Sequence, residues 1–194
     1  MALTAVAAGD LATVVTTLEM RRRPPLRPLP PSPFRLVHWR TPALDRYRAL
    51  FRRVGARWLW YSRLALGDAA LAAILADPQV SVFAATDATG IEIGMVELDH
   101  RTPGTCAIAY FALVPELAGR GHGRWLMAEA LARAWRPGVE RVWLNTCTLD
   151  HPRALGFYRA QGFAAVARTI ETFPDPRAIG LLPADAAPQI PLLA

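Results

Sequence analysis

The chain has 194 residues, 53% of them hydrophobic, which suits one folded α/β domain with extensions and excludes disorder over most of its length. Its formal net charge of +6 comes from arginine alone, because the sequence contains no lysine, and most of the arginines are scattered along the chain. Nucleic-acid binding needs clustered positive charge, so we expect no nucleic-acid partner and rank a basic nucleic-acid binder last among the functions considered.

The sequence patterns predict a cytoplasmic protein. The apolar runs fall short of the ~20 residues that span a bilayer, and Asp10 interrupts the apolar stretch near the N-terminus. The two cysteines, Cys106 and Cys147, suit a reduced compartment better than a disulfide scaffold. Together with the four histidines they show no metal-ligand spacing, so we expect no metal. We also expect no membrane partner, because the apolar runs are too short to span a bilayer.

The first third of the chain predicts two strands and a helix. Residues 11–20 are rich in Val and Thr and predict a strand, whereas the proline-rich residues 21–33 predict an extended, semi-rigid connector. Residues 34–39 alternate between apolar and polar side chains, as a half-buried strand does. A helix follows, with Thr41 as its expected N-cap and Gly55 as its end.

Strands and helices then alternate to the end of the chain. The expected elements are a helix over 68–77, a hairpin of strands over 80–85 and 92–99, a strand over 105–114, a helix over 123–135, a strand over 141–146, a helix over 153–161 and a strand over 163–172. This order predicts a mixed α/β sheet with helices on both faces. We divide the chain into an N-terminal strand with its connector (1–33), a main domain (34–173) and a tail (174–194) that lies on the surface or packs on a partner subunit.

A glycine-rich loop between the strand over 105–114 and the next helix is the most informative motif. Gly119, Gly121 and Gly123 stand at alternate positions, where the missing Cβ atoms let the backbone approach a ligand closely. Successive N–H groups at a helix N-terminus bind phosphate, and the guanidinium groups of Arg120 and Arg124 suit phosphate oxygens. The loop therefore predicts a site for a pyrophosphate-bearing cofactor.

Two common phosphate-binding motifs do not fit this loop. The dinucleotide fingerprint requires another glycine spacing, and the phosphate loop of nucleotide hydrolases requires a lysine that the chain lacks. Instead, residues 118–123 (AGRGHG) resemble the acyl-CoA loop of the GNAT N-acetyltransferases, Gln/Arg-x-x-Gly-x-Gly/Ala, with Ala118 in place of the usual Gln or Arg.

A second block is similar to the same superfamily. Residues 157–163 (FYRAQGF) resemble its closing helix, which ends in Phe-Tyr-x-x-x-Gly-Phe. Gly162 suits the left-handed position after a helix, with Phe163 packing back on the last turn. The two blocks stand in the family's order and at a family-like separation. The resemblance covers about residues 80–167 and implies a central, mostly antiparallel sheet flanked by helices.

The resemblance also implies how acetyl-CoA binds. Pantetheine would pair with the backbone of the strand before the loop, and a backbone N–H near Leu113 would polarise the thioester carbonyl. The cofactor-binding residues that the resemblance implies are Phe111, Ala112, Leu113, Gly119, Arg120, Gly121, His122, Gly123, Arg124 and His151. For Phe111 and Leu113 a plain core strand is compatible with this role, since the cofactor uses their main chain. His151 stands where the family often has an Asn, but Asp150-His151-Pro152 also suits a simple turn.

Tyr158 and Glu97 are the two candidate catalytic residues. Tyr158 matches the family tyrosine that donates a proton to the departing sulfur, although a packing role beside Phe157 and Phe163 is also compatible with its position. Glu97 lies within an apolar strand, where a carboxylate that faces a cleft is a candidate general base. A solvent-facing position in an alternating strand explains Glu97 equally well.

The sequence therefore predicts an enzyme that transfers an acetyl group from acetyl-CoA to a primary amine, small molecule or peptide, by direct attack in a ternary complex. Trp58, Trp60 and Tyr61 form either an aromatic wall of the acceptor site or a cover of the core. The alternative function is a non-catalytic CoA-binding sensor or scaffold. An exposed edge strand and the tail make a homodimer plausible.

Overall fold

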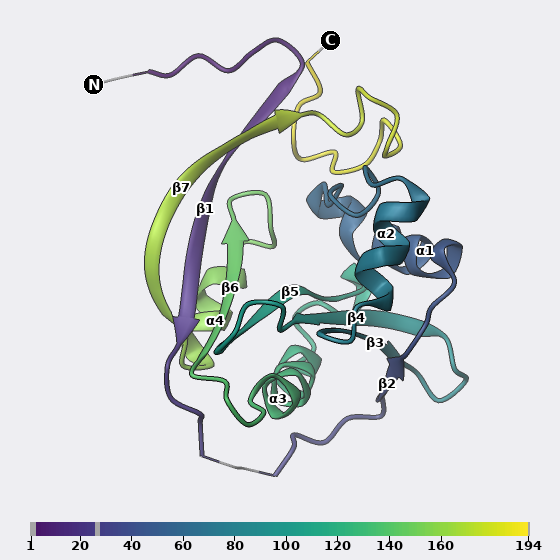
Figure 1. Ribbon diagram of the computed structural model, residues 1–194. Helices are drawn as coiled ribbons and strands as arrows, with labels where there is room; N and C mark the ends of the chain where they lie inside the picture. The colour runs from purple at the N-terminus through teal and green to yellow at the C-terminus, as the bar shows by residue number, and fades with distance from the viewer. Residues whose placement is uncertain (1–2, 26–27, 194) are drawn as a thin grey trace.

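The computed structural model describes residues 3–25 and 28–193 (Figure 1). Residues 1 and 2, residues 26 and 27 of the predicted connector and residue 194 of the tail lie outside the described part. The strands form one seven-stranded sheet in the order β2-β3-β4-β5-β6-β1-β7. Their bounds are Asp10–Met20 (β1), Arg35–Trp39 (β2), Val80–Thr86 (β3), Glu92–Asp99 (β4), Thr105–Leu113 (β5), Arg141–Cys147 (β6) and Ala164–Pro174 (β7). Every neighbouring pair is antiparallel except β5 and β6, so the mostly antiparallel sheet is confirmed.

Helices cover both faces of the sheet, as expected (Figure 1). The α-helices span Leu44–Gly55 (α1), Asp68–Ala76 (α2), His122–Ala134 (α3) and Ala154–Ala160 (α4), and short 3₁₀ turns span Ala56–Trp58 (η1) and Pro115–Leu117 (η2). α1 and α2 pack on β3, β4 and β5 from one side, and α3 packs on β4 and β5 from the other. α4 lies beside α3. Among the described residues, no helix is long and apolar enough to cross a membrane.

The apolar face of α1 forms a large part of the core. Tyr47, Leu50, Phe51 and Val54 are all buried, as their helical spacing predicts. The expected N-cap is wrong: the helix begins at Leu44, after Ala43, and no side chain caps its first turn. Thr41 precedes that turn and is exposed, so its hydroxyl contributes no cap.

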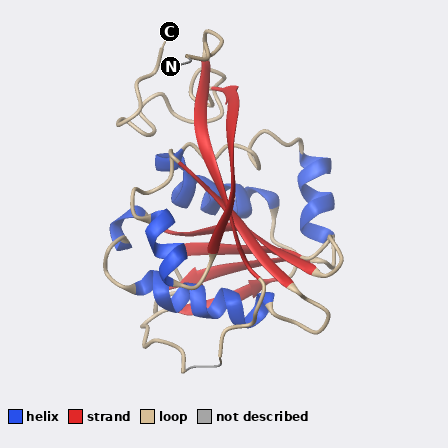
Figure 2. Cartoon of the chain, turned by 90° about the vertical axis from the view of Figure 1, so that its left-hand side faces the viewer, coloured by secondary structure: helices blue, strands red, loops and turns tan. Residues whose placement is uncertain are grey.

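The N-terminal strand β1 lies inside the sheet rather than beside it. It pairs antiparallel with β6 along Val15–Met20 and with β7 along Asp10–Glu19. Figure 2 shows the long strands rising from the body of the protein. Leu18 on β1 is fully buried, so the segment that precedes the connector supplies part of the core of the main domain.

Strand β7 forms the outer edge of the sheet, and from Ala164 to Thr172 its residues are exposed on both faces. Among them, Ile170 is 69% exposed and Val166 is 50% exposed. An unpaired edge of this length is a surface on which another strand can pair. The homodimer that the sequence suggests stays a prediction.

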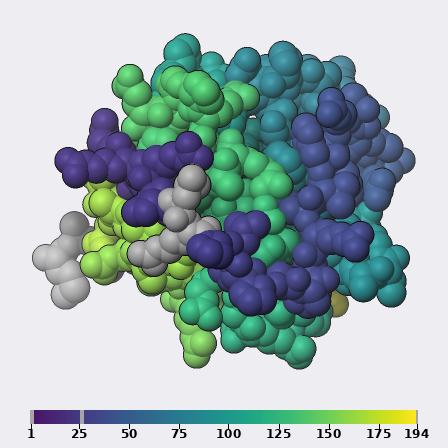
Figure 3. All heavy atoms as spheres, turned by 90° about the horizontal axis from the view of Figure 1, so that it is seen from below, coloured from purple at the N-terminus to yellow at the C-terminus, as the bar shows by residue number. Residues whose placement is uncertain are grey.

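The connector and the tail both lie against the domain. The described residues of the connector run beneath the sheet from β1 to β2 and remain on the surface (Figures 1 and 3). From the sequence, we expect the tail to lie on the surface or to pack on a partner subunit. In the structure it folds back on its own chain. Leu182 and Ala187 are buried in its core, at 4% and 1% exposure.

Candidate active site

A cavity of about 860 Å³ opens where β5 and β6 diverge. The two strands pair with each other only along Thr105–Ala107 of β5. A β-bulge at Ala109 then shifts the register between β5 and its other neighbour, β4. Beyond this point both strands leave a free edge, and Ile108–Leu113 and Leu144–Cys147 line the cavity between them. The sheet itself therefore creates an open slot next to an unpaired backbone.

The backbone of β5 presents unused hydrogen-bonding groups to this slot. Val114 donates its N–H to Ile93 O on the β4 side, at 2.8 Å. Because N–H groups alternate between the two edges of a strand, those of Phe111 and Leu113 point to the opposite, unpaired edge. The three residues predicted to hold the cofactor arm, Phe111, Ala112 and Leu113, thus lie on the wall of the cavity.

The glycine loop leads from β5 into α3 and closes one end of the slot. Gly119 and Gly121 have φ angles of +77° and +88°, in the left-handed region, and Gly121 is the N-cap of α3. This alternation of backbone conformations directs successive N–H groups to one side, as in phosphate-binding loops. A Cβ at Gly123 would stand 3.5 Å from the Phe157 ring, so this position holds α3 close to α4.

The structure separates the basic residues that the sequence grouped together. Arg124 lines the cavity, and so does Arg153, which the sequence analysis did not single out. Arg120 is exposed and His122 packs its ring against Phe34 at 4.7 Å, and neither residue lines the cavity. Arg124 and Arg153 are therefore the cavity-lining cations nearest to the loop and to the start of α4.

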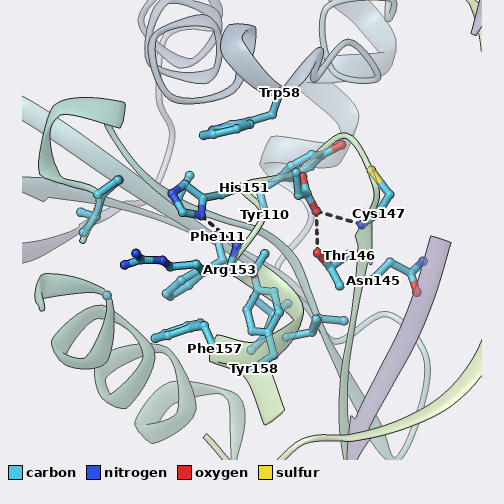
Figure 4. Close-up of a pocket in the computed structure, with 18 of the residues that line it drawn as sticks. Trp58, Tyr110, Phe111, Asn145, Thr146, Cys147, His151, Arg153, Phe157 and Tyr158 are labelled. Atoms are coloured by element: carbon cyan, nitrogen blue, oxygen red, sulfur yellow. Dashed lines mark hydrogen bonds between the residues drawn. The ribbon is translucent and has the colours of Figure 1, made fainter. Parts of the chain in front are cut away.

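Tyr158 points from α4 toward the slot, next to Phe157 (Figure 4). Its ring packs against Phe111, Phe157 and Phe163 at centroid distances of 6.1, 5.4 and 6.3 Å. Burial, and to a lesser extent the negative charge of Asp150, raises the pKa of Tyr158 above its ordinary value. The phenol thus stays protonated at neutral pH.

The turn after α4 explains how this helix is fixed. Gly162 has a φ of +99°, and Phe163 donates its N–H to Tyr158 O at 3.2 Å. This is the left-handed helix end predicted from the sequence, and it is confirmed. It anchors the turn of helix that carries Tyr158.

Asp150 is a site residue that sequence reasoning treated only as part of a turn. One of its oxygens accepts hydrogen bonds from Thr146 Oγ1 at 2.8 Å and from the Cys147 N–H at 3.0 Å (Figure 4). The other accepts a longer bond from Trp60 Nε1, at 3.4 Å. Asp150 lines the cavity, and the position of this carboxylate directly after the β6 edge was the signal available in the sequence.

His151 and Trp58 form another part of the wall. Their rings meet edge to face at 5.5 Å, and His151 Nδ1 accepts a hydrogen bond from the Arg153 N–H at 3.1 Å. Trp58 lies across the cavity from Phe157 and Tyr158 (Figure 4). The aromatic segment predicted for the acceptor side thus contributes Trp58 and Trp60 to the lining, whereas Tyr61 stacks on Phe173 at 4.8 Å.

Glu97 occupies a different place from the other candidates. It is fully buried and does not line the cavity. Its oxygens accept hydrogen bonds from Arg63, at 2.5 Å, and from the Tyr47 hydroxyl, at 2.6 Å. Burial and then the Glu97 carboxylate raise the pKa of Tyr47. The role of Glu97 as a general base stays a prediction. Its hydrogen bond from Tyr47 joins β4 to α1, and its buried ion pair with Arg63 joins β4 to the loop between η1 and α2.

The two cysteines differ in their place relative to the cavity, and both have raised pKa values. Cys147 lines the cavity, and burial together with the nearby Asp150 raises its pKa, which disfavours the thiolate. Cys106 is fully buried, and its pKa rises to about 12. Within residues 3–25 and 28–193, no group of three or more His, Cys, Asp or Glu side chains is placed to hold a metal ion.

Comparison with known proteins identifies the family. The model of the acetyltransferase (GNAT) family matches residues 35–163, which is well over half of the chain. The chain therefore belongs to the GNAT acetyltransferase family. No curated protein sequence matches the chain significantly.

Several solved structures share the fold. A GCN5-related N-acetyltransferase from Sphaerobacter thermophilus has a TM-score of 0.60 and 17% identity, over 84% of this chain and 51% of that chain. An aminoglycoside acetyltransferase from an uncultured soil metagenomic sample has a TM-score of 0.57 and 17% identity, over 72% of this chain and 93% of that one. A tandem GNAT protein of the clavulanic acid biosynthesis pathway has a TM-score of 0.53 and 22% identity, over 84% and 53%.

A functionally unknown conserved protein from Staphylococcus epidermidis is also similar, with a TM-score of 0.52 and 14% identity, over 86% of this chain and 63% of that one. The chain thus spans between about half and two thirds of three of these four structures. At such identities the likeness defines the fold and leaves the substrate open.

The left-handed glycine of the loop can be tested against a matched glycine elsewhere. We expect Gly121→Ala to weaken CoA binding at least ~10-fold, about 1.4 kcal/mol, because a side chain at this φ strains the loop and turns its N–H groups. Gly90→Ala is the control, since Gly90 has nearly the same φ, +89°, and an open place in the β3–β4 turn, while a Cβ at Gly121 would lie in ordinary contact with the Arg124 side chain, at 3.9 Å. Calorimetric titration of both folded variants with CoA is the measurement. Equal affinities of the two variants would show that the loop does not hold the cofactor.

Proposed function

We propose that the protein is an N-acetyltransferase that transfers the acetyl group of acetyl-CoA to a primary amine by direct attack in a ternary complex. The observation that carries this proposal is the unpaired edge of β5, which runs between the glycine loop and Tyr158 along one wall of a single cavity. An open strand edge suits the amide groups of a pantetheine arm, and the loop at its end suits a pyrophosphate.

The chain's own groups fit each part of acetyl-CoA. The loop N–H groups from Gly119 to Gly123, with Arg124, would hold the pyrophosphate, and the edge of β5 would hold the arm. The N–H of Leu113 would then donate to the thioester oxygen, where negative charge develops as the amine attacks. His151 and Arg153, at the start of α4, are further polar contacts for the cofactor.

Tyr158 supplies the proton that the reaction needs at sulfur. The amine nitrogen forms a bond to the carbonyl carbon, the carbon–sulfur bond breaks, and Tyr158 donates its proton to the departing thiolate. A phenol with a raised pKa is fully protonated before the step, which favours a donor over a base in this position. The tyrosinate then regains a proton from solvent.

Asp150 is better placed than Glu97 to take the proton from the attacking amine. It lies on the cavity wall, oriented by hydrogen bonds from Thr146 and the Cys147 N–H, whereas Glu97 is engaged by Arg63 and Tyr47 away from the cavity. We therefore assign Asp150 as the proton acceptor and Glu97 as a buried structural anchor.

A covalent acyl-cysteine is not part of this proposal. The pKa of Cys147 is raised, and Cys106 is buried away from the cavity, so neither thiol is activated. Transfer in a single ternary complex requires no enzyme nucleophile. The departures from the family pattern, Ala118 in the loop and His151 before α4, keep the non-catalytic CoA-binding module as the alternative.

Release of CoA thiol from acetyl-CoA in the presence of a panel of amines tests the proposal. We expect turnover with at least one amine, and we expect Tyr158→Phe to lower kcat by ~10²-fold, because general acid catalysis contributes on this scale. The dissociation constant of CoA should remain unchanged in the same variant, since the cofactor contacts lie elsewhere. Tight CoA binding without turnover on any amine would instead support the binding module.

The choice of proton acceptor has its own test in the pH dependence of kcat/KM. Asp150→Asn should lose ~10²-fold at neutral pH and recover as the pH rises, because a growing fraction of the amine is then already deprotonated. Glu97→Gln should keep the native pH profile and lower the free energy of unfolding by about 3 kcal/mol, because it leaves the Arg63 charge buried without its partner. The opposite pattern, recovery at high pH in Glu97→Gln alone, would restore Glu97 as the base.

A further inference from the structure

The C-terminal segment, residues 175–193, is held in one shape by a buried arginine. Arg177 is 6% exposed, and it donates to both carboxylate oxygens of Asp175, at 3.0 and 2.7 Å. Its remaining N–H groups donate to backbone carbonyls further along the tail, at Ala186, Ala187, Ile190 and Pro191. One side chain thus closes a loop of more than ten residues into a compact unit.

This compact unit contacts the aromatic segment that follows α1. Gln189 donates its side-chain N–H to Arg57 O at 2.9 Å. At the point where β7 passes into the tail, Phe173 stacks on Tyr61 with a centroid distance of 4.8 Å and an interplanar angle of 17°. The C-terminal part of the chain therefore contacts the segment of residues 57–61 at both of its ends.

The aromatic segment needs such support because its backbone is strained. Leu59 has a φ of +56°, a left-handed conformation that a residue with a branched side chain rarely adopts. Strain of this kind persists only where surrounding contacts hold it. Leu59 is buried at 2% exposure, whereas its neighbours Trp58 and Trp60 line the cavity.

The same segment is tied to the site from its other side. Trp60 Nε1 donates to Asp150, and the hydroxyl of Ser62, directly after the segment, shares a hydrogen bond of 2.5 Å with the Tyr110 hydroxyl. Trp58 lies across the cavity from Phe157 and Tyr158 (Figure 4). Any movement of residues 57–61 would thus shift two aromatic walls and the orientation of Asp150.

We infer that the C-terminal segment, locked by Arg177, is a positioning element of the acceptor site: it holds residues 57–61 so that Trp58 and Trp60 shape the acceptor end of the cavity. This inference rests on the proposed function, because that function makes this end of the cavity the place of the amine. Arg177 itself acts at a distance, through the tail and residues 57–61, and touches no substrate.

Hydrogen exchange and kinetics of Arg177→Met test the inference, with Arg168→Met as the matched control. Arg168 lies on the exposed edge strand β7 and does not line the cavity. In Arg177→Met we expect faster amide exchange in residues 57–61 and unchanged exchange in the glycine loop. For the best amine of the panel we expect KM to rise ~10-fold, because small displacements of positioning groups are costly, while the dissociation constant of CoA stays within about twofold.

Two milder variants show whether the effects of Arg177→Met arise merely from a loss of folding. Arg177→Lys should restore part of the native KM, because a lysine keeps a charge next to Asp175 but forms fewer carbonyl contacts. Gln189→Ala, at an exposed position, should change exchange and KM in the same direction by a smaller factor. Native exchange in residues 57–61 in both Arg177→Met and Gln189→Ala would overturn the inference.

The exchange measurement separates this inference from the proposed function. If no amine is acetylated but Arg177→Met still loosens residues 57–61, the acetyltransferase proposal fails and the mechanical coupling stands. If amines are acetylated and Arg177→Met leaves their KM unchanged, or changes CoA affinity equally, the positioning role fails and the proposed function stands.

Discussion

The structure depends on the divergence of β5 from β6. The two parallel strands share only three paired positions before the bulge at Ala109 separates them, and every later feature of the site uses the gap that results. The gap exposes N–H groups of β5, which are costly to leave unpaired in a protein interior and are therefore suited to a ligand that pairs with them. It also brings the glycine loop, at the end of β5, and Asp150, after β6, to the same cavity.

An open slot in the middle of a sheet has to be stabilised by the elements around it. β1 compensates on one side, because it pairs with β6 along Val142–Cys147 and buries Leu18. On the other side, Tyr47 fixes α1 on β4, and the Glu97–Arg63 ion pair fixes the loop between η1 and α2 on the same strand. The C-terminal segment then holds the aromatic residues that cover the slot. The cavity is thus framed by parts of the chain that lie far apart in the sequence.

Patterns of neighbouring residues in the sequence predicted those features of the fold that depend on local interactions. The strand and helix order and the left-handed Gly162 follow from periodicity and turn chemistry. The resemblance to the GNAT N-acetyltransferases, and not periodicity, implied that the glycine loop and Tyr158 belong to one site, and both contribute residues to the cavity wall. The place of β1 between β6 and β7, the packing of the tail and the pairing of Glu97 with Arg63 depend on contacts between distant residues, which periodicity does not encode. Asp150 was missed for a related reason: its turn chemistry is local, but its role depends on Thr146 and Trp60.

Amide hydrogen exchange with and without CoA tests the central claim that the unpaired edge of β5 receives the cofactor arm. The account predicts slower exchange on CoA binding at Phe111 and Leu113 and in residues 119–123, with no change at Ala112 and Val114, whose N–H groups face β4. Alternate-residue protection along one strand is the signature of a ligand paired with one edge. Protection that spares β5, or that falls equally on its two edges, would contradict the account.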